Sequence, residues 1–250
     1  AGGGGKGMHV VFEAANLIDR LKTSTVEAKR YFGDHRVYAE AFIENPRHIE
    51  VQILGDGKGN VVHLFERECS IQRRFQKIIE ETPAPNLGDS LRDNICQTAC
   101  KLAKSVNYKN AGTVEFVVGE QNQFYFLEMN TRLQVEHPVT ELVCNIDLVK
   151  AQLEIAYSNK IPIDQDDIKQ KGHAIEIRVC SEDPSRNFAP STGKIEELVL
   201  PKLDDVRYDF GIQKKQTIST DFDSMVGKLI CFGPSRKNAI SKCEAALKQI

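Results

Sequence analysis

Three oxygen-bearing side chains, Glu115, Glu128 and Asn130, fall in two segments that have the pattern of a β-hairpin. The apolar stretches GTVEFVV and QFYFLEMN flank the short polar sequence GEQN. A turn centred between Gln121 and Asn122 places Glu115 directly opposite Glu128, where like charges are destabilising unless a cation lies between them. Carboxylate and amide oxygens suit Mg²⁺ or Mn²⁺. We therefore predict a metal site here, with a solvated strand face in a slipped register as the alternative.

The segment that follows carries polar side chains at every second position. If the chain stays extended, these side chains point the same way: Glu128, Asn130, Arg132, Gln134 and Glu136. Such an array could bind an anionic oxyacid beside a metal-bound nucleotide, with one carboxylate left as a general base. The pair His137-Pro138 then ends the extended run. An edge strand with one wet face is the alternative.

Basic residues lie in a second stretch, SIQRRFQKIIEETPAP, at residues 70–85. Arg73, Arg74 and Lys77 give local positive charge, followed closely by two acidic residues, Glu80 and Glu81. A solvated charged turn or the start of a helix is the alternative to an anion site.

Two further features could bind anions. The glycines of AGGGGKG, residues 1–7, can bring backbone N–H groups close to phosphate oxygens. Met8 stands where a P-loop has Ser or Thr, and a flexible linker is the alternative. Arg178 lies in the alternating sequence HAIEIRVC, where a guanidinium group could recognise a carboxylate; an ion pair with Glu176 is the alternative.

The elements that must position these residues mix strands and helices without βαβ alternation, which predicts an α+β fold. A short strand and a helix should occupy residues 10–32, ending near Gly33, and a helix capped by Asp89 or Ser90 should span 89–106. Further helices are expected at 146–158 and at the end of the chain. Strands are expected at 37–43, 48–54, 60–68, 112–118, 123–130, 173–180, 194–200 and 228–232.

Composition excludes several classes of protein. The 250 residues are 41% hydrophobic and 27% charged, as in ordinary globular chains, and the net charge of -2 predicts no general affinity for nucleic acid or anionic membranes. No apolar run could span a bilayer and no secretory leader opens the sequence. The seven cysteines contain no CxxC pair, so we expect reduced, mostly buried thiols. Both ends look truncated, and we expect a fragment of a longer protein.

Taken together, the motifs resemble the biotin carboxylases, members of the ATP-grasp superfamily. The matching stretches occur in the family's order over nearly the whole chain: GGGGKGM, ENPRHIEVQILGDGKGNVVHLFERECSIQRRFQKIIEE, AGTVEF, FLEMNTRLQVEHPVTE, GHAIEIRVCSEDP and FDSMVGKLI. The resemblance implies an ATP-grasp lid at residues 1–45, the main catalytic part at 46–170 and the biotin carboxylase C-terminal part at 171–250. Phe75 replaces a histidine found in many relatives, and His9 follows Met8 where arginine is common.

The resemblance also implies roles for single residues. ATP would be bound by Gly3, Gly4, Gly5, Lys6, Gly7, Met8, Glu40, Ala41, Ile43, His48, Gln72, Glu115 and Glu128. The metal ligands would be Glu115, Glu128 and Asn130. Bicarbonate and biotin would meet Arg132, Gln134, Val135, Glu136 and Arg178. Catalytic roles would fall to Glu136 as general base, Arg178 at the biotin oxygen, Arg132, and Lys77 near the phosphates.

The implied reaction carboxylates biotin on a biotin carboxyl carrier, using ATP and bicarbonate through carboxyphosphate. The implied partners are that carrier and a carboxyltransferase, with a homodimer in the cytoplasm or the mitochondrial matrix. The family's N-terminal domain and its two ATP-binding lysines are absent from these residues, so we expect the chain by itself to be inactive. A carbamoyl-phosphate-forming ligase and a non-catalytic interaction module are the rival interpretations.

Overall fold

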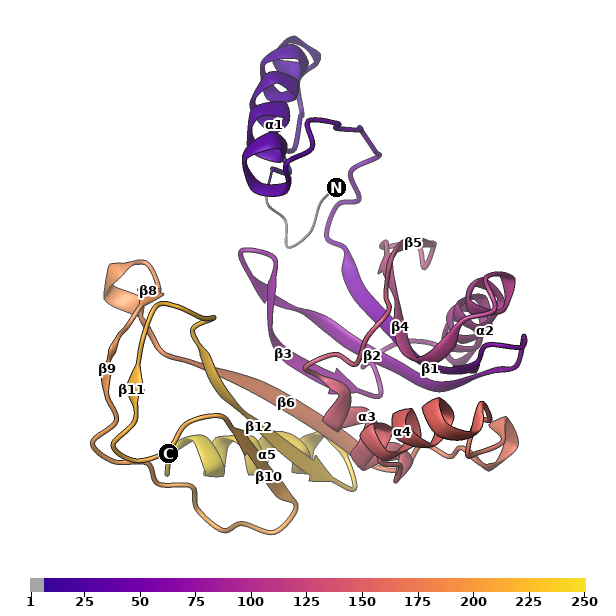
Figure 1. Cartoon of the computed structure of the whole chain (residues 1–250), viewed down its shortest axis with the longest axis vertical. Helices are drawn as coiled ribbons and strands as arrows, with labels where there is room; N and C mark the ends of the chain where they lie inside the picture. The colour runs from indigo at the N-terminus through magenta and orange to yellow at the C-terminus, as the bar shows by residue number, and fades with distance from the viewer. Residues whose placement is uncertain (1–6) are drawn as a thin grey trace.

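The structure, a computed structural model, describes residues 7–250 and is built around one antiparallel sheet of eight strands (Figure 1). The strands follow in the order β10 (Val206–Phe210), β12 (Met225–Gly233), β6 (His173–Cys180), β3 (Gln76–Thr82), β2 (Val61–Arg73), β1 (Arg47–Asp56), β4 (Lys109–Val118) and β5 (Phe124–Asn130). Two small ribbons pair β9 (Gly193–Lys194) with β11 (Thr217–Ile218) and β7 (Glu182–Asp183) with β8 (Ala189–Pro190). The predicted α+β class is confirmed.

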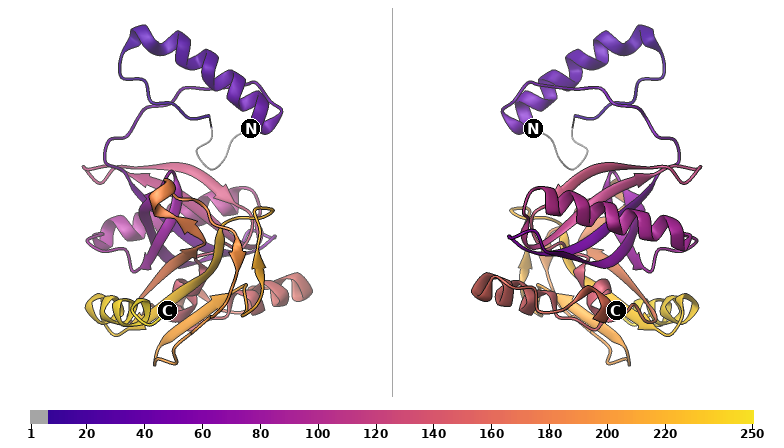
Figure 2. Two further views of the ribbon diagram at one scale, coloured as in Figure 1. Left: turned by 90° about the vertical axis from the view of Figure 1, so that its left-hand side faces the viewer. Right: turned by 90° about the vertical axis from the view of Figure 1, so that its right-hand side faces the viewer.

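Helices cover both faces of the sheet. α2 (Asp89–Ser105) and α5 (Arg236–Leu247) pack on one face, and α3 (His137–Cys144) and α4 (Leu148–Ser158) pack on the other. α1 (Leu17–Phe32), preceded by the short helix η1 (Ala14–Asn16), stands apart from the sheet (Figure 2). Two further short helices, η2 (Gln165–Asp167) and η3 (Pro184–Arg186), lie in connections. None of the helices described is long and apolar enough to cross a membrane.

Alternation along the central strand β1 separates the core from the polar face. Ile49, Val51 and Ile53 are fully buried in the cluster that includes α2. The residues between them, Glu50 and Gln52, are equally buried but face the side of α3 and α4. The strand is thus buried on both faces, with apolar side chains toward α2 and the polar side chains of Glu50 and Gln52 on the opposite face.

The same division holds at the other end of the sheet. Ile175 and Leu229 pack with α5, whereas the alternate positions on β6 and β12, including Glu176, Arg178 and Lys228, face the other side. Strands from the parts on either side of residue 170 therefore contribute to one continuous polar face.

Most predicted elements form, including the β1–β2 hairpin, whose connection places Gly57 and Gly59 at positive φ. The predicted strand at 37–43 is wrong, because no described strand lies alongside it to complete its hydrogen bonds. The strand expected from residue 10 is also absent, and the one at 194–200 is reduced to β9. Gly88, not Asp89 or Ser90, occupies the N-cap position of α2, without a side-chain cap. The Asp89 carboxylate accepts a hydrogen bond from Arg92 Nη1. All seven cysteines are free and most are buried.

The hairpin of β4 and β5 has the predicted pairing for an unpredicted reason. Gly119 faces Gln123 across a turn centred on Gln121, half a residue away from the expected centre. A bulge beyond Phe116 then shifts the register and places Glu115 opposite Glu128. The extended run expected to continue to residue 136 ends at Asn130, and His137 begins α3 instead of only breaking a strand.

Candidate active site

A row of charged residues crosses four neighbouring strands on the face that carries α3 and α4. Glu50 on β1 lies opposite Arg67 on β2 and, on its other side, opposite Glu115 on β4. Glu115 in turn lies opposite Glu128 on β5. Three glutamates thus stand in line, an arrangement that is unfavourable unless cations are bound among them.

Lys77 on β3 supplies one of these cations. Its ammonium group contacts the carboxylate of Glu50 and donates to Glu115 Oε1 at 3.0 Å and to Glu136 Oε1 at 2.7 Å. Burial raises the pKa of Glu50 and of Glu115, but neighbouring groups outweigh it and hold each pKa at about 2. The charges of Lys77 and Arg67 act on Glu50, and the hydrogen bond from His48 and the charge of Lys77 act on Glu115. Burial alone would lower the pKa of Lys77, but the surrounding carboxylates outweigh burial and raise this pKa well above its usual range.

Arg178 on β6 binds the Glu136 carboxylate, which Lys77 also contacts, through the other oxygen. Its Nη2 donates to Glu136 Oε2 at 3.0 Å, and its Nε donates to Glu80 Oε1 at 2.6 Å. Glu136 is buried and receives two cationic donors, one on each oxygen. Arg178 thus pairs with Glu136 and Glu80, and not with Glu176, the ion pair considered as the alternative.

Arg67 is a residue of this site that the sequence reasoning missed. Its fully buried guanidinium group contacts Glu50, Gln52 at 2.8 Å and Gln134 at 3.1 Å, together with the hydroxyl groups of Thr113 and Thr140. Gln134 connects Arg67 to Glu115, because its amide nitrogen donates to Glu115 Oε1 at 2.7 Å. Glu50 and Glu80 were missed as well. These residues could have been recognised from the sequence, because each is a charged residue in an otherwise apolar strand.

The metal-compatible groups converge at the β4–β5 end of this row. Asn130 Nδ2 lies 2.9 Å from Glu115 Oε1 and 3.5 Å from Glu128 Oε1, so one amide reaches both carboxylates. Rotation of the amide would turn its oxygen toward the same point. Two carboxylates and an amide oxygen fit a hard divalent cation. His48 Nε2 lies 2.7 Å from Glu115 Oε2, and Gln72 Nε2 lies 3.2 Å from His48 Nδ1, so both predicted nucleotide-side residues adjoin this point.

Several predicted site residues that the structure describes lie apart from this cluster. Gly3, Gly4, Gly5 and Lys6 fall outside the described residues, whereas Gly7 is placed and Met8 is exposed. Glu40 and Ala41 are exposed, and Ile43 lines a cavity of about 220 Å³ beside the β4–β5 turn. Arg132 is exposed because β5 ends at Asn130, two residues earlier. Its Nη1 donates to the Leu133 carbonyl group.

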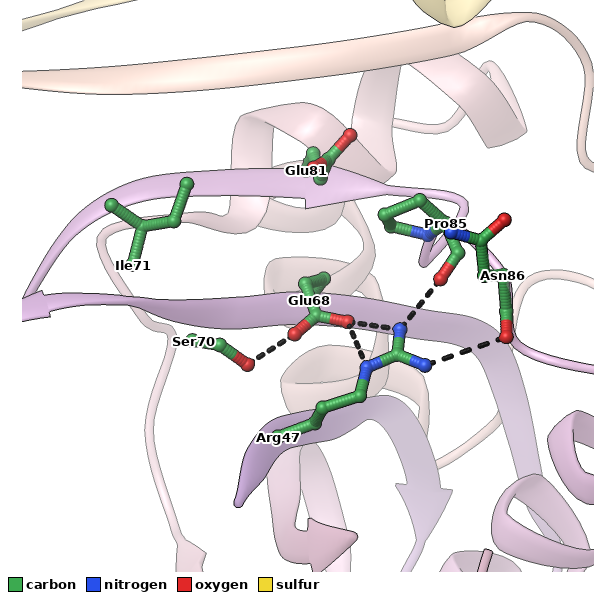
Figure 3. Close-up of a pocket in the computed structure, with 7 residues that line it drawn as sticks. All are labelled: Arg47, Glu68, Ser70, Ile71, Glu81, Pro85 and Asn86. Carbon is green, nitrogen blue, oxygen red and sulfur yellow. Dashed lines mark hydrogen bonds and ion pairs between the residues drawn. The ribbon is translucent and has the colours of Figure 1, made fainter. Parts of the chain in front are cut away.

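A larger cavity, of about 330 Å³, opens on the opposite face of the sheet (Figure 3). Its only arginine, Arg47, contacts Glu68 and the carbonyl groups of Pro85 and Asn86 (Figure 3). Glu81 is held by His173 and Arg236. These charges are already paired, and none of the predicted site residues lines this cavity.

Comparison with known proteins agrees with the geometry. Residues 1–164 match the family described as carbamoyl-phosphate synthase L chain, ATP binding domain, and residues 176–250 match the biotin carboxylase C-terminal domain. The chain belongs to the biotin carboxylase family. Biotin carboxylase 2 of Bacillus subtilis is 49% identical over 99% of this chain and 56% of its own length. The mitochondrial methylcrotonoyl-CoA carboxylase subunit alpha of Rattus norvegicus is 46% identical over 99% of this chain and 35% of its own length.

Solved biotin carboxylase structures have the same fold. A Campylobacter jejuni biotin carboxylase in a complex described as β-γ-ATP superposes with a TM-score of 0.95 at 44% identity, covering 99% of this chain and 55% of that one. The biotin carboxylase domain dimer of Hydrogenobacter thermophilus 2-oxoglutarate carboxylase, described with MgADP, ADP and bicarbonate, has a TM-score of 0.95 at 41% identity, with 99% and 55% coverage. The chain thus spans about a third to just over half of the length of these relatives.

Proposed function

We propose that the protein containing this chain carboxylates biotin with bicarbonate at the expense of ATP. The observation that carries the proposal is the buried Glu136 carboxylate, held by Lys77 on one oxygen and Arg178 on the other. A carboxylate placed between two cations beside a metal-compatible cluster can serve as a base in a site built for anionic substrates.

Glu136 would take the proton of bicarbonate. The freed bicarbonate oxygen then forms a bond to the γ-phosphorus of ATP as the bond to ADP breaks, giving carboxyphosphate. Arg132, Gln134 and the Val135 backbone would orient bicarbonate, while Lys77 would offset charge on the transferring phosphoryl group. Gln134 is already aimed by its contacts to Arg67 and Glu115.

Carboxyphosphate would then break down to CO₂ and phosphate. Biotin N1′ would give its proton to the phosphate just released and form the new N–C bond to CO₂. Arg178 would stabilise the negative oxygen that develops on the ureido group, an oxyanion role. Its bond to Glu80 on the far side holds the guanidinium group in place.

Glu115, Glu128 and Asn130 would hold Mg²⁺ or Mn²⁺. When bound, this metal supplies positive charge to the nucleotide phosphates. His48 and Gln72 would contact the nucleotide, and the adenine would lie near Glu40, Ala41 and Ile43, of which Ile43 lines the cavity beside the β4–β5 turn. Gly3, Gly4, Gly5, Lys6, Gly7 and Met8 would form the lid over the phosphates.

A carbamoyl-phosphate-forming activity is the second candidate, because residues 1–164 match an ATP-binding family described by that enzyme. Both reactions would begin with carboxyphosphate, and they differ in the acceptor. The C-terminal match over residues 176–250, which includes Arg178, favours biotin as acceptor.

The organisation of the whole protein is part of the proposal. We divide the chain into a lid at 1–45, a main catalytic part at 46–170 and a C-terminal part at 171–250. The protein would act on a biotin carboxyl carrier domain and feed a carboxyltransferase, as a homodimer in the cytoplasm or the mitochondrial matrix. Turnover would require the rest of the protein as well as this chain.

The deciding experiment measures ADP formation by the full-length protein with free biotin, with ammonia, or with neither. Bicarbonate-dependent ADP formation that biotin stimulates, together with carboxybiotin as product, is the expected result. Stimulation by ammonia alone would support the second candidate and contradict the first.

A further inference from the structure

Lys228 on β12 is a buried lysine that the reaction described above does not use. It lies opposite Arg178 on β6 and opposite Asp209 on β10. Two cations facing each other across neighbouring strands destabilise a sheet, and a buried ammonium group is costly unless it is well paired. Its placement therefore calls for an explanation.

The hydrogen bond of Lys228 supplies one. Glu176 Oε2 and Asp209 Oδ2 lie 3.8 and 3.9 Å from its Nζ, beyond hydrogen-bond distance. The ammonium group instead donates to the carbonyl oxygen of Val135, 93 residues away in the sequence. The nearby Asp209 carboxylate offsets its charge, while its donor is directed at the segment between β5 and α3.

That segment is held at three points. The Gln134 side chain contacts Arg67 and Glu115, and the Glu136 side chain contacts Lys77 and Arg178. These side chains face the proposed substrates, so their contacts must rearrange as bicarbonate enters. The bond from Lys228 to the Val135 carbonyl group can persist, because Lys228 contacts none of the proposed substrates. The contact of His137 Nδ1 with the Gln134 carbonyl group at 2.8 Å can persist as well, but it is local to the segment, whereas Lys228 ties the segment to a distant strand.

We propose that Lys228 is a positioning residue, which fixes the Gln134–Glu136 backbone through the Val135 carbonyl group and so lets the C-terminal part align the bicarbonate site. The inference rests on the proposed function. Lys228 would make no contact with substrate. Its removal should therefore change the kinetics with bicarbonate and the hydrogen exchange of this segment, and leave ATP binding unchanged.

The test compares Lys228→Met with wild type in the full-length protein, with Lys228→Arg as the conservative variant and Lys237→Met, on the exposed surface of α5, as control. We expect Lys228→Met to lower kcat/KM for bicarbonate about tenfold to a hundredfold and to leave KM for ATP within about twofold. Lys228→Arg should recover part of the loss. Hydrogen exchange should accelerate at residues 134–137 but not in β6.

Equal effects on both substrates, unchanged kinetics, or faster exchange throughout the sheet would overturn the inference. If Lys228→Met does not fold, Lys228→Gln replaces it with the same measurements, and failure of both variants to fold would show that Lys228 serves overall stability alone. A wild-type protein without bicarbonate-dependent ADP formation would instead contradict the proposed function, so the two failures are distinguishable.

Discussion

Glu80 on β3 and Glu176 on β6 lie directly opposite each other, and both are completely buried. Neither carboxyl oxygen of Glu176 has a hydrogen-bond partner among the described residues, and one carboxyl oxygen of Glu80 has none. Burial raises the pKa of Glu80 to about 7, because Arg178 offsets it only in part, and burial raises the pKa of Glu176 well above its usual range. The pair therefore favours bound protons in the folded protein.

This pair predicts the sign of a pH dependence. A carboxyl whose pKa is higher in the folded state takes up a proton on folding between its ordinary value of 4.5 and, for Glu80, about 7. Stability from the pair should fall as pH rises through that window. Glu176→Gln should raise the free energy of unfolding by about 1–3 kcal/mol at pH 8, and by less at pH 5. Urea titrations at both pH values test this, with exposed Glu197→Gln as control. A variant less stable at pH 8 than at pH 5, relative to wild type, would contradict it.

Removing Lys77 should destabilise the protein. Lys77→Met leaves Glu50, Glu115 and Glu136 without their shared cation, and an uncompensated buried charge costs about 3–5 kcal/mol. We expect a lower urea midpoint at pH 7 and a smaller loss of stability on acidification, since the pKa values of Glu50 and Glu115, about 2 in the wild type, would rise. Lys101→Met, on the exposed face of α2, is the control. An unchanged midpoint would show that the three contacts contribute nothing to stability.

The metal assignment predicts a change in cation requirement without loss of fold. Glu128 is exposed, so Glu128→Gln should retain the wild-type melting temperature. It should raise the Mg²⁺ concentration needed for half-maximal turnover about tenfold or more, with partial rescue by Mn²⁺. Glu197→Gln, on the exposed surface away from the site, should match wild type. Overlapping Mg²⁺ titrations for Glu128→Gln and wild type would contradict the assignment.

Glu136 and Arg178 should have separable roles although they touch. Glu136→Ala should abolish bicarbonate-dependent ADP formation, because the base is lost. Arg178→Ala should retain some ATP cleavage while losing carboxybiotin formation about a hundredfold or more. Measuring ADP and carboxybiotin in the same reactions checks both. Equal loss of the two products in Arg178→Ala would indicate that Arg178 only holds Glu136 in place.

Local patterns in the sequence determined the β1–β2 and β4–β5 hairpins, the helices α1, α2, α4 and α5, and the α+β class, because strand alternation and helix periodicity depend on neighbouring residues. They did not predict α3, β3 or β10. The pairing of Glu115 with Glu128 also followed from local spacing, although a bulge was needed to produce it. The strand predicted at 37–43 failed for the complementary reason: a strand requires a partner, and its own sequence cannot show whether one lies beside it.

Tertiary structure alone decided which charges meet. Glu50, Lys77, Glu136 and Arg178 come from separate segments, and only the order β6-β3-β2-β1-β4 brings them to one face. The contact of Lys228 with Val135 likewise spans 93 positions. A sequence shows that an inward-facing charge in an apolar strand needs a partner, because burial without one is costly. The packing of distant strands determines which partner it finds.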